Sequence, residues 1–168
     1  MHADDAMTCA AGSATKLRIE VLQRPADLSA IGQWIFDQWA RHEDASVWPA
    51  NRADLLRSLD AGVTVPKFFV GRVGKRRVGC ASIVAADLPT RPALGPWLAN
   101  ILVLPQWRGR GYGRQLARAA MAHACRHGEV LYLYTFDQVA LYQHLGWEVA
   151  EADSYAGRPI SIMRYRCA

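Results

Sequence analysis

Residues 102–116, LVLPQWRGRGYGRQL, connect an apolar segment to a segment with helical periodicity. Three alternating glycines leave one side of this loop without side chains, so a ligand can reach the backbone there. The first N–H groups of the following helix have no intrahelical partner and point outward, which indicates an anion site. Arg108, Arg110 and Arg114 are unfavourable beside the positive end of a bare helix dipole. They become favourable if a phosphate lies between them and that end.

The pattern on each side of this loop predicts the surrounding elements. The apolar run 97–104 shows no alternation, so it predicts a strand in the middle of a sheet. Along the whole chain the predicted order is β-α-α-β-β-β-α-β-α-β-β, which indicates a mixed α/β class around one sheet. Strands are predicted over 16–24, 67–73, 78–86, 97–104, 130–136, 147–152 and 160–166, and helices over 26–42, 49–62, from the loop to about 127, and 138–146.

Two common phosphate-binding motifs do not match the loop. Its glycines follow a G-x-G-x-G spacing two thirds along the chain, whereas the dinucleotide fingerprint requires G-x-G-x-x-G early in a chain. No Lys-Ser or Lys-Thr pair follows the glycines, which excludes a P-loop. A Gly-rich turn with solvated arginines stays open as the simplest interpretation.

Composition indicates one domain over 16–168, preceded by a small, polar segment 1–15 that we predict to be a disordered tail. The chain has 168 residues, a hydrophobic fraction of 51% and a formal net charge of +5. This basic excess favours an anionic partner, for which nucleic acid and an organic phosphate both qualify. No run of about 18 apolar residues is present, so no membrane span is expected.

The four cysteines, Cys9, Cys80, Cys125 and Cys167, are widely separated and form no C-x-x-C pair. We therefore expect reduced, mostly buried thiols in a cytoplasmic protein. No metal site is predicted.

Segment 102–116 resembles the acetyl-CoA signature of the GNAT superfamily of N-acetyltransferases. In that signature a strand ends in V-x-P, and R/Q-x-x-G-x-G/A then opens a helix. A second segment, ALYQHLGW at 140–147, resembles the family's A-x-x-x-Y-x-x-x-G-F element, with Tyr142 and the Gly-Trp pair at matching positions. The two segments occur in the family's order with a strand between them, and the resemblance covers about 97–147.

The resemblance implies a fold, a donor and the residues that bind the donor. The expected fold is α/β (α+β), with a single mixed, mostly antiparallel sheet flanked by helices and two central strands that splay apart. Acetyl-CoA is expected to enter the gap, where its pantetheine arm pairs with the backbone of Ile101, Leu102 and Val103 as a strand adds to a sheet edge. The pyrophosphate is expected at the loop, which comprises Arg108, Gly109, Arg110, Gly111, Tyr112, Gly113 and Arg114.

Acetyl transfer to an amine requires a neutral amine, donors for the thioester oxygen and a proton for the departing thiolate. The resemblance implies that Tyr142 supplies the proton, and the alternative is a tyrosine that only packs in the core. The base stays open among Glu43, Asp44, Asp87 and a water chain.

The acceptor wall is predicted from the early helical region and the Pro-rich loop 88–96. Trp34 and Trp39 have the spacing of core residues, so Trp48 is the candidate for the wall, together with Asp87.

The resulting prediction is an acetyl-CoA-dependent N-acetyltransferase that acts directly on a primary amine of a small molecule, protein or peptide. A non-catalytic acyl-CoA sensor stays open because strand 97–104 contains no Asp, Glu or His. An RNA-binding domain is disfavoured because no aromatic-rich RNA-binding strand is present. We expect no nucleic-acid partner, no membrane partner, and a monomer or homodimer.

Overall fold

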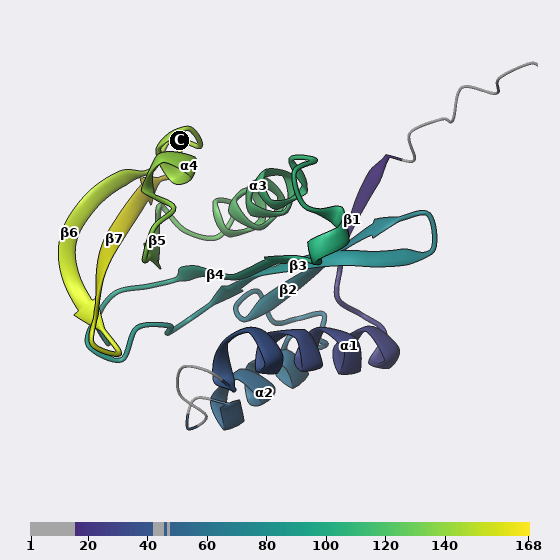
Figure 1. The fold of residues 1–168 in the computed structure, drawn as a ribbon. Helices are drawn as coiled ribbons and strands as arrows, with labels where there is room; N and C mark the ends of the chain where they lie inside the picture. Colours follow the sequence, from purple (N-terminus) through teal and green to yellow (C-terminus); the bar gives the residue numbers. More distant parts are fainter. Residues whose placement is uncertain (1–15, 42–45, 47) are drawn as a thin grey trace, which may run out of the picture.

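In the computed structural model, which describes residues 16–41, 46 and 48–168, seven strands form one mixed sheet. Their order is β1-β2-β3-β4-β5-β7-β6, and every neighbouring pair is antiparallel except β4 and β5 (Figure 1). The strands are β1 (Leu17–Val21), β2 (Lys67–Val73), β3 (Arg76–Val84), β4 (Trp97–Val103), β5 (Val130–Thr135), β6 (Glu148–Tyr155) and β7 (Arg158–Arg166). The predicted order of elements and the central position of the apolar strand, β4, are confirmed.

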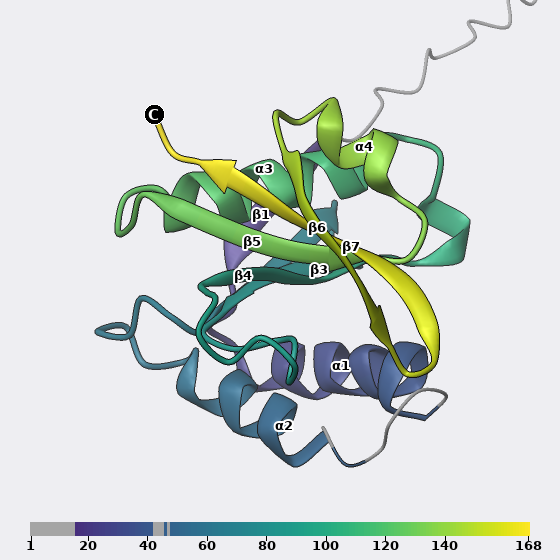
Figure 2. The same ribbon diagram turned by 90° about the vertical axis from the view of Figure 1, so that its left-hand side faces the viewer.

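Helices cover both faces of this sheet. One face carries α1, a π-helical turn η1 and α2, while α3 lies on the opposite face (Figures 1 and 2). The short α4 lies on the α3 side, next to β6 and β7. The helices are α1 (Pro25–Ile35), η1 (Phe36–Ala40), α2 (Trp48–Arg57), the 3-10 turn η3 (Pro105–Trp107), α3 (Tyr112–Ala124) and α4 (Val139–Gln143).

Alternation along the strands divides the core into two layers. Phe68 of β2 packs with Ile31 of α1 and Leu55 of α2, whereas the next residue, Phe69, packs on the other face with Leu116 of α3. All seven residues of β2 are buried, because helices cover both of its faces.

Strands β4 and β5 meet at their first residues and then separate. Among the described residues, the register between these two strands consists of one pair, Trp97 and Tyr132. By contrast, β5 and β7 pair along six residues, from Val130 to Thr135. The predicted splayed central strands are therefore confirmed, and the inner edges of β4 and β5 lack a strand partner beyond this pair.

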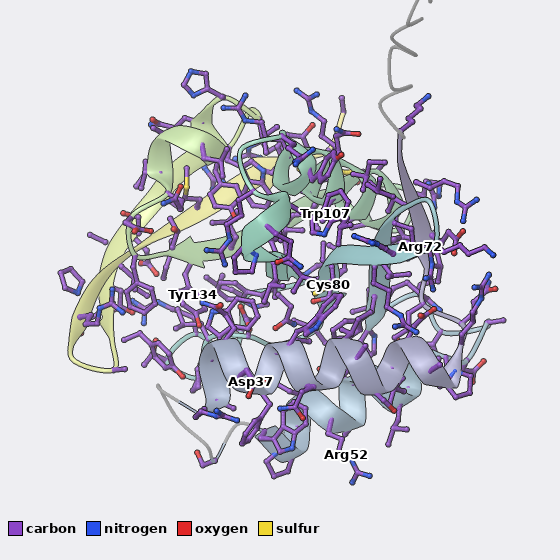
Figure 3. The ribbon with its side chains drawn as sticks, turned by 45° about the vertical axis from the view of Figure 1, so that its right-hand side comes forward. Asp37, Arg52, Arg72, Cys80, Trp107 and Tyr134 are labelled. Atoms are coloured by element: carbon purple, nitrogen blue, oxygen red, sulfur yellow. A yellow bond between two sulfur atoms is a disulfide. The ribbon has the colours of Figure 1, made fainter. Side chains whose placement is uncertain are left out.

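The expectation of four reduced cysteines is wrong for two of them. Cys125 follows the end of α3 and Cys167 follows the end of β7, and the fold brings their Cα atoms to 5.3 Å and joins them in a disulfide. Cys80 is a free, buried thiol in β3, at the centre of the sheet (Figure 3). Cys9 lies outside the described residues.

No helix within the described part of the chain is long and apolar enough to cross a membrane.

Candidate active site

A β-bulge interrupts β4 where the sheet begins to split. Two residues, Asn100 and Ile101, face the single Ala81 of β3. Asn100 has a left-handed φ of 54°, a conformation that Asn tolerates better than most residues. Its Nδ2 donates to Ser82 Oγ at 2.9 Å, and Ser82 Oγ donates to the Ala99 carbonyl at 3.1 Å. Because bulges change the direction of the backbone, this network fixes how β4 turns away from β5.

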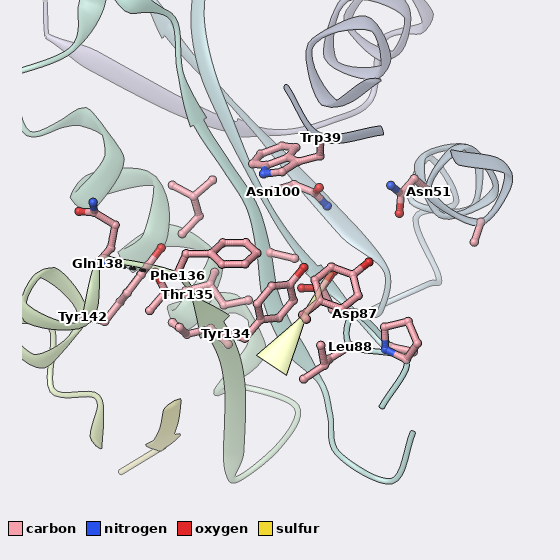
Figure 4. Close-up of a pocket in the computed structure, with 18 of the residues that line it drawn as sticks. Trp39, Asn51, Asp87, Leu88, Asn100, Tyr134, Thr135, Phe136, Gln138 and Tyr142 are labelled. Atoms are coloured by element: carbon pink, nitrogen blue, oxygen red, sulfur yellow. Dashed lines mark hydrogen bonds between the residues drawn. The ribbon is translucent and has the colours of Figure 1, made fainter. Parts of the chain in front are cut away.

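A cavity of about 450 Å³ occupies the split. Figure 4 shows Tyr142 and Gln138 at one end, Asp87 and Asn51 at the other, and Phe136 between them. Residues from β4, from the end of β5, from the loop that precedes β4, and from both helical layers line it. The cavity therefore depends on segments distributed over most of the described chain.

The cavity extends from one face of the sheet to the other. Four aromatic residues in its wall pack with the core layer under α1 and α2, and these are Trp39, Tyr134, Phe136 and Tyr155. Ile101 and Tyr142, which also line the cavity, pack with the core layer under α3. A molecule bound on one face can thus meet a molecule bound on the other through the split.

Tyr142 of α4 stands at the α3 end of this cavity. Its ring packs edge-on against Trp147, with 6.2 Å between the ring centroids. Burial raises the pKa of the Tyr142 hydroxyl to about 12, so the phenol keeps its proton at neutral pH. The residue can therefore serve as a hydrogen-bond donor and proton source at this position.

A second cavity, of about 400 Å³, lies at the Gly/Arg loop. Gly109 and Gly111 both have left-handed φ angles, of 74° and 75°, and a Cβ added at either position would meet no atom within 4 Å. The glycines therefore supply backbone conformation and open space beside the start of α3. The helix begins after Gly111. Its first turn, which the structure describes in full, has no side-chain cap and no acidic residue.

The three arginines of the loop take different positions. Arg108 donates from Nε to the Val103 carbonyl at 2.9 Å. The guanidinium carbon of Arg110 lies 5.3 Å from the centroid of the Trp107 ring. Arg108 and Arg114 line the loop cavity, and no carboxylate among the described residues pairs with any of the three. This end of α3 thus keeps a positive potential that suits an anion.

The inner edge of β4 connects the two cavities. Ile101 lines the cavity in the split, and Val103 lines the cavity at the loop, on the same side of the strand. Leu102 points to the opposite face and is buried. Consecutive residues of α4 continue the connection, because Leu141 lines the loop cavity and Tyr142 lines the split.

The residues predicted for the acceptor wall lie in two different places. Asp87 is half-buried and lines the cavity in the split. Trp48 opens α2 and packs edge-on against Phe36, with 5.3 Å between ring centroids, and it does not line the cavity. Trp39 packs against the core, as its spacing indicated, and also lines the wall. The candidate bases Glu43 and Asp44 lie outside the described residues.

Comparison with known proteins identifies the class. The sequence profile of the Acetyltransferase (GNAT) domain matches residues 65–149, which is half of the chain. The chain therefore belongs to the GNAT acetyltransferase family, whose members use acetyl-CoA as the acetyl donor. The resemblance found over 97–147 is confirmed.

One curated relative has a modest sequence identity to the chain. N-alpha-acetyltransferase 80 of Mus musculus is 30% identical over 134 residues, which cover 76% of the chain and 40% of the mouse protein. The chain thus spans about two fifths of the length of this curated relative.

Solved structures share the fold. The yncA protein of Salmonella typhimurium, determined with acetyl-CoA, has a TM-score of 0.70 at 19% identity, and the match covers 91% of this chain and 95% of yncA. A GNAT-family acetyltransferase of Streptococcus pneumoniae has a TM-score of 0.67 at 17% identity, and the match covers 91% of this chain and all of that one.

Proposed function

We propose that this protein transfers an acetyl group from acetyl-CoA directly to a primary amine. The observation that carries this proposal is the cavity that extends through the sheet from one face to the other. Its α3 side connects along Ile101 and Val103 to the positive loop. Its opposite side is an aromatic chamber, lined by Trp39, Tyr134, Phe136 and Tyr155. A donor and an acceptor can therefore bind on opposite faces and meet at the split.

The loop residues fit the pyrophosphate of acetyl-CoA. N–H groups of 109–114 offer donors, the glycines leave the backbone accessible, and Arg108 and Arg114 add positive charge. The unpaired inner edge of β4 at 101–103 fits the amides of the pantetheine arm, which can pair with it as an added strand does. Leu102 contributes through its backbone, since its side chain is buried on the opposite face.

The chemistry needs three contributions at the split. The acceptor amine, whose usual pKa is near 10.4, must be neutral to attack the thioester carbon. The thioester oxygen gains negative charge, which backbone N–H groups at the β4 bulge can stabilise. As the C–N bond forms and the C–S bond breaks, the nitrogen loses a proton to a carboxylate or to water, and the departing thiolate takes a proton from Tyr142. The Tyr142 phenol is protonated at neutral pH, its raised pKa of about 12 extends this to alkaline pH, and it regains its proton from solvent.

Substitution at Gly111 tests the donor site. We expect Gly111→Glu to weaken CoA binding by about 100-fold, or about 3 kcal/mol, because it adds bulk and negative charge where the phosphates bind. Gly74→Glu is the matched control: Gly74 has a φ of 59°, also has no atom within 4 Å of an added Cβ, and lies in the β2–β3 turn. The wild-type affinity should also fall as salt rises.

Calorimetric titration of CoA into both variants measures this difference. If the Gly111→Glu and Gly74→Glu proteins bind CoA with equal affinity, the loop is not the donor site. Turnover then separates an enzyme from a sensor, since an enzyme releases free CoA from acetyl-CoA at a rate that depends on the added amine. If CoA binds but no amine in a broad panel raises that rate, the chain is an acyl-CoA sensor.

A further inference from the structure

We infer that the acceptor is a primary amine on a flat, apolar body that carries no acid group, such as an arylalkylamine. This inference rests on the proposed function, because it assigns the aromatic chamber to the acceptor. It follows from three properties of the chamber: its rings, its charge and its size.

The rings form a continuous aromatic wall. Tyr134 packs against Phe136 and against Tyr155, with 6.1 Å and 5.6 Å between ring centroids, and both contacts are edge-on. Trp39 of η1 adds an indole to the same chamber (Figure 4). Such a wall favours a flat apolar group, and the ring faces attract a cation as it arrives.

The acidic residues in the cavity lining contrast with the basic charge of the chain. The chain has a net charge of +5, with 20 lysines and arginines. Asp87 lines the cavity at the chamber end and Asp137 lines it beside Gln138, and no lysine, arginine or histidine of the described residues does so. An amine that arrives as its ammonium form is therefore attracted. A carboxylate on the same molecule is repelled and finds no cationic partner among the described residues of the wall.

Two arginines lie near the chamber without lining it. Arg91 pairs with Glu151 and Asp153 of β6, so carboxylates offset its charge. Arg158 stacks on Phe136, with its guanidinium carbon 4.0 Å from the ring centroid. The Phe136 ring thus engages a cation of the protein itself, and Trp39, which lines the cavity from η1, is the ring that the variants below test.

The size of the cavity favours a small acceptor. Its volume of about 450 Å³ is near the lower end for ligand sites, and the acetyl end of the donor must share it. The ion pairs of Arg91 also tie the loop before β4 to β6, which closes one side of the chamber. A compact amine fits this space better than an extended peptide.

Amines that differ by one group test the inference. We compare kcat/KM for 2-phenylethylamine, L-phenylalanine, 1,4-diaminobutane and a peptide with a free N-terminal phenylalanine. L-Phenylalanine adds only a carboxylate to the first amine, and 1,4-diaminobutane keeps the charge but lacks the ring. We expect 2-phenylethylamine to exceed each of the other three by at least about tenfold.

Variants connect this preference to the chamber. Trp39→Leu should lower kcat/KM for 2-phenylethylamine about tenfold, and Trp39→Phe should recover most of the loss. Trp34→Leu is the matched control, since Trp34 packs on the same core layer without lining the chamber. Asp87→Asn should reduce the preference for 2-phenylethylamine over L-phenylalanine. This preference is a ratio of two kcat/KM values measured on the same variant, so it does not depend on how much of the variant is folded.

Binding of the same amines to the CoA-saturated protein, measured by calorimetry, separates this inference from the proposed function. If binding follows the expected order but no amine is acetylated, the inference stands and the catalytic function falls. If 1,4-diaminobutane, L-phenylalanine or the peptide is bound and acetylated as well as 2-phenylethylamine, the inference is overturned and the catalytic function stands.

Discussion

Tyr142 combines a protonated hydroxyl with a partly buried position beside the split. Burial raises the pKa of this phenol to about 12. A CoA thiol bound in the same surroundings would meet the same desolvation, which raises the pKa of a thiol. A departing thiolate therefore stays basic enough to accept the proton, which makes the pair of groups suitable for transfer.

Replacement of Tyr142 by Phe removes one oxygen and keeps the ring that packs on Trp147. We expect kcat to fall at least about tenfold while the KM for acetyl-CoA changes little, since a positioned general acid contributes about 10²–10⁴-fold. Single-turnover rates should fall equally, which excludes masking by slow product release.

The pH profile gives a second measurement of this residue. The hydroxyl stays protonated below its raised pKa of about 12, so the wild-type rate should rise towards pH 10 as the amine deprotonates, without an alkaline decline caused by Tyr142. Tyr165→Phe is the control, because Tyr165 also packs on Trp147 but does not line the cavity. Unchanged single-turnover rates for Tyr142→Phe would show that Tyr142 does not donate the proton and only packs against its neighbours.

Single residues also show where sequence reasoning stopped. The spacing of ALYQHLGW predicted a tyrosine at the split, because the motif fixes both the short helix and its place after β5. The tryptophans were less predictable. The helical period placed Trp39 against the core, where it does pack, but it did not show that Trp39 also lines the cavity, because the helix continues as the π-helical turn η1.

At the scale of elements, β4 depends on the Ser82 hydroxyl for its bulge. Ser82→Ala would leave Asn100 Nδ2 and the Ala99 carbonyl without this partner, so we expect a loss of stability of about 1–3 kcal/mol. We also expect a lower kcat, because the backbone beside the thioester would shift.

Ser58→Ala is the matched control for this position. Ser58 is equally buried, and its hydroxyl donates to the Leu55 carbonyl at 3.0 Å, far from the split. Denaturant unfolding should show losses for both variants, whereas steady-state kinetics should show a change in kcat for Ser82→Ala alone. Equal kcat values would mean that the network stabilises the sheet without positioning the reaction.

The helices and strands were predictable where the hydrophobic pattern of neighbouring residues alone determines them. Alternation and apolar runs predicted every strand in order, and the central place of β4 followed from its lack of alternation. The bulge was not predictable, because WLANILV contains no glycine or proline to mark it. Its cause is the long-range bond between Asn100 and Ser82.

At the scale of the whole molecule, the disulfide joins the end of α3 to the end of the chain's last strand. Cys125 and Cys167 are 42 residues apart, so a sequence without a close cysteine pair did not predict their contact. Closing a loop of this length restricts the unfolded chain and stabilises the fold by about 2–4 kcal/mol.

We expect Cys125→Ser to lower the free energy of unfolding by about that amount and to make stability insensitive to reductant. Denaturant titration with and without dithiothreitol measures both effects. Cys80→Ser is the control, because Cys80 is a free thiol, and this variant should keep its sensitivity to reductant. A wild-type protein with equal stability in both conditions would show that the bond contributes nothing in solution.

The split between β4 and β5 also bears on aggregation. An unpaired strand edge is a template for a strand of another molecule, and here such edges lie in the middle of the sheet. The left-handed Asn100 interrupts the edge of β4, so that only a short regular stretch at 101–103 remains. A ligand with two amides can use so short an edge, whereas a polypeptide strand would gain few hydrogen bonds from it. The bulge thus keeps the risk of edge-to-edge association small while 101–103 stays open, as the proposed donor site requires.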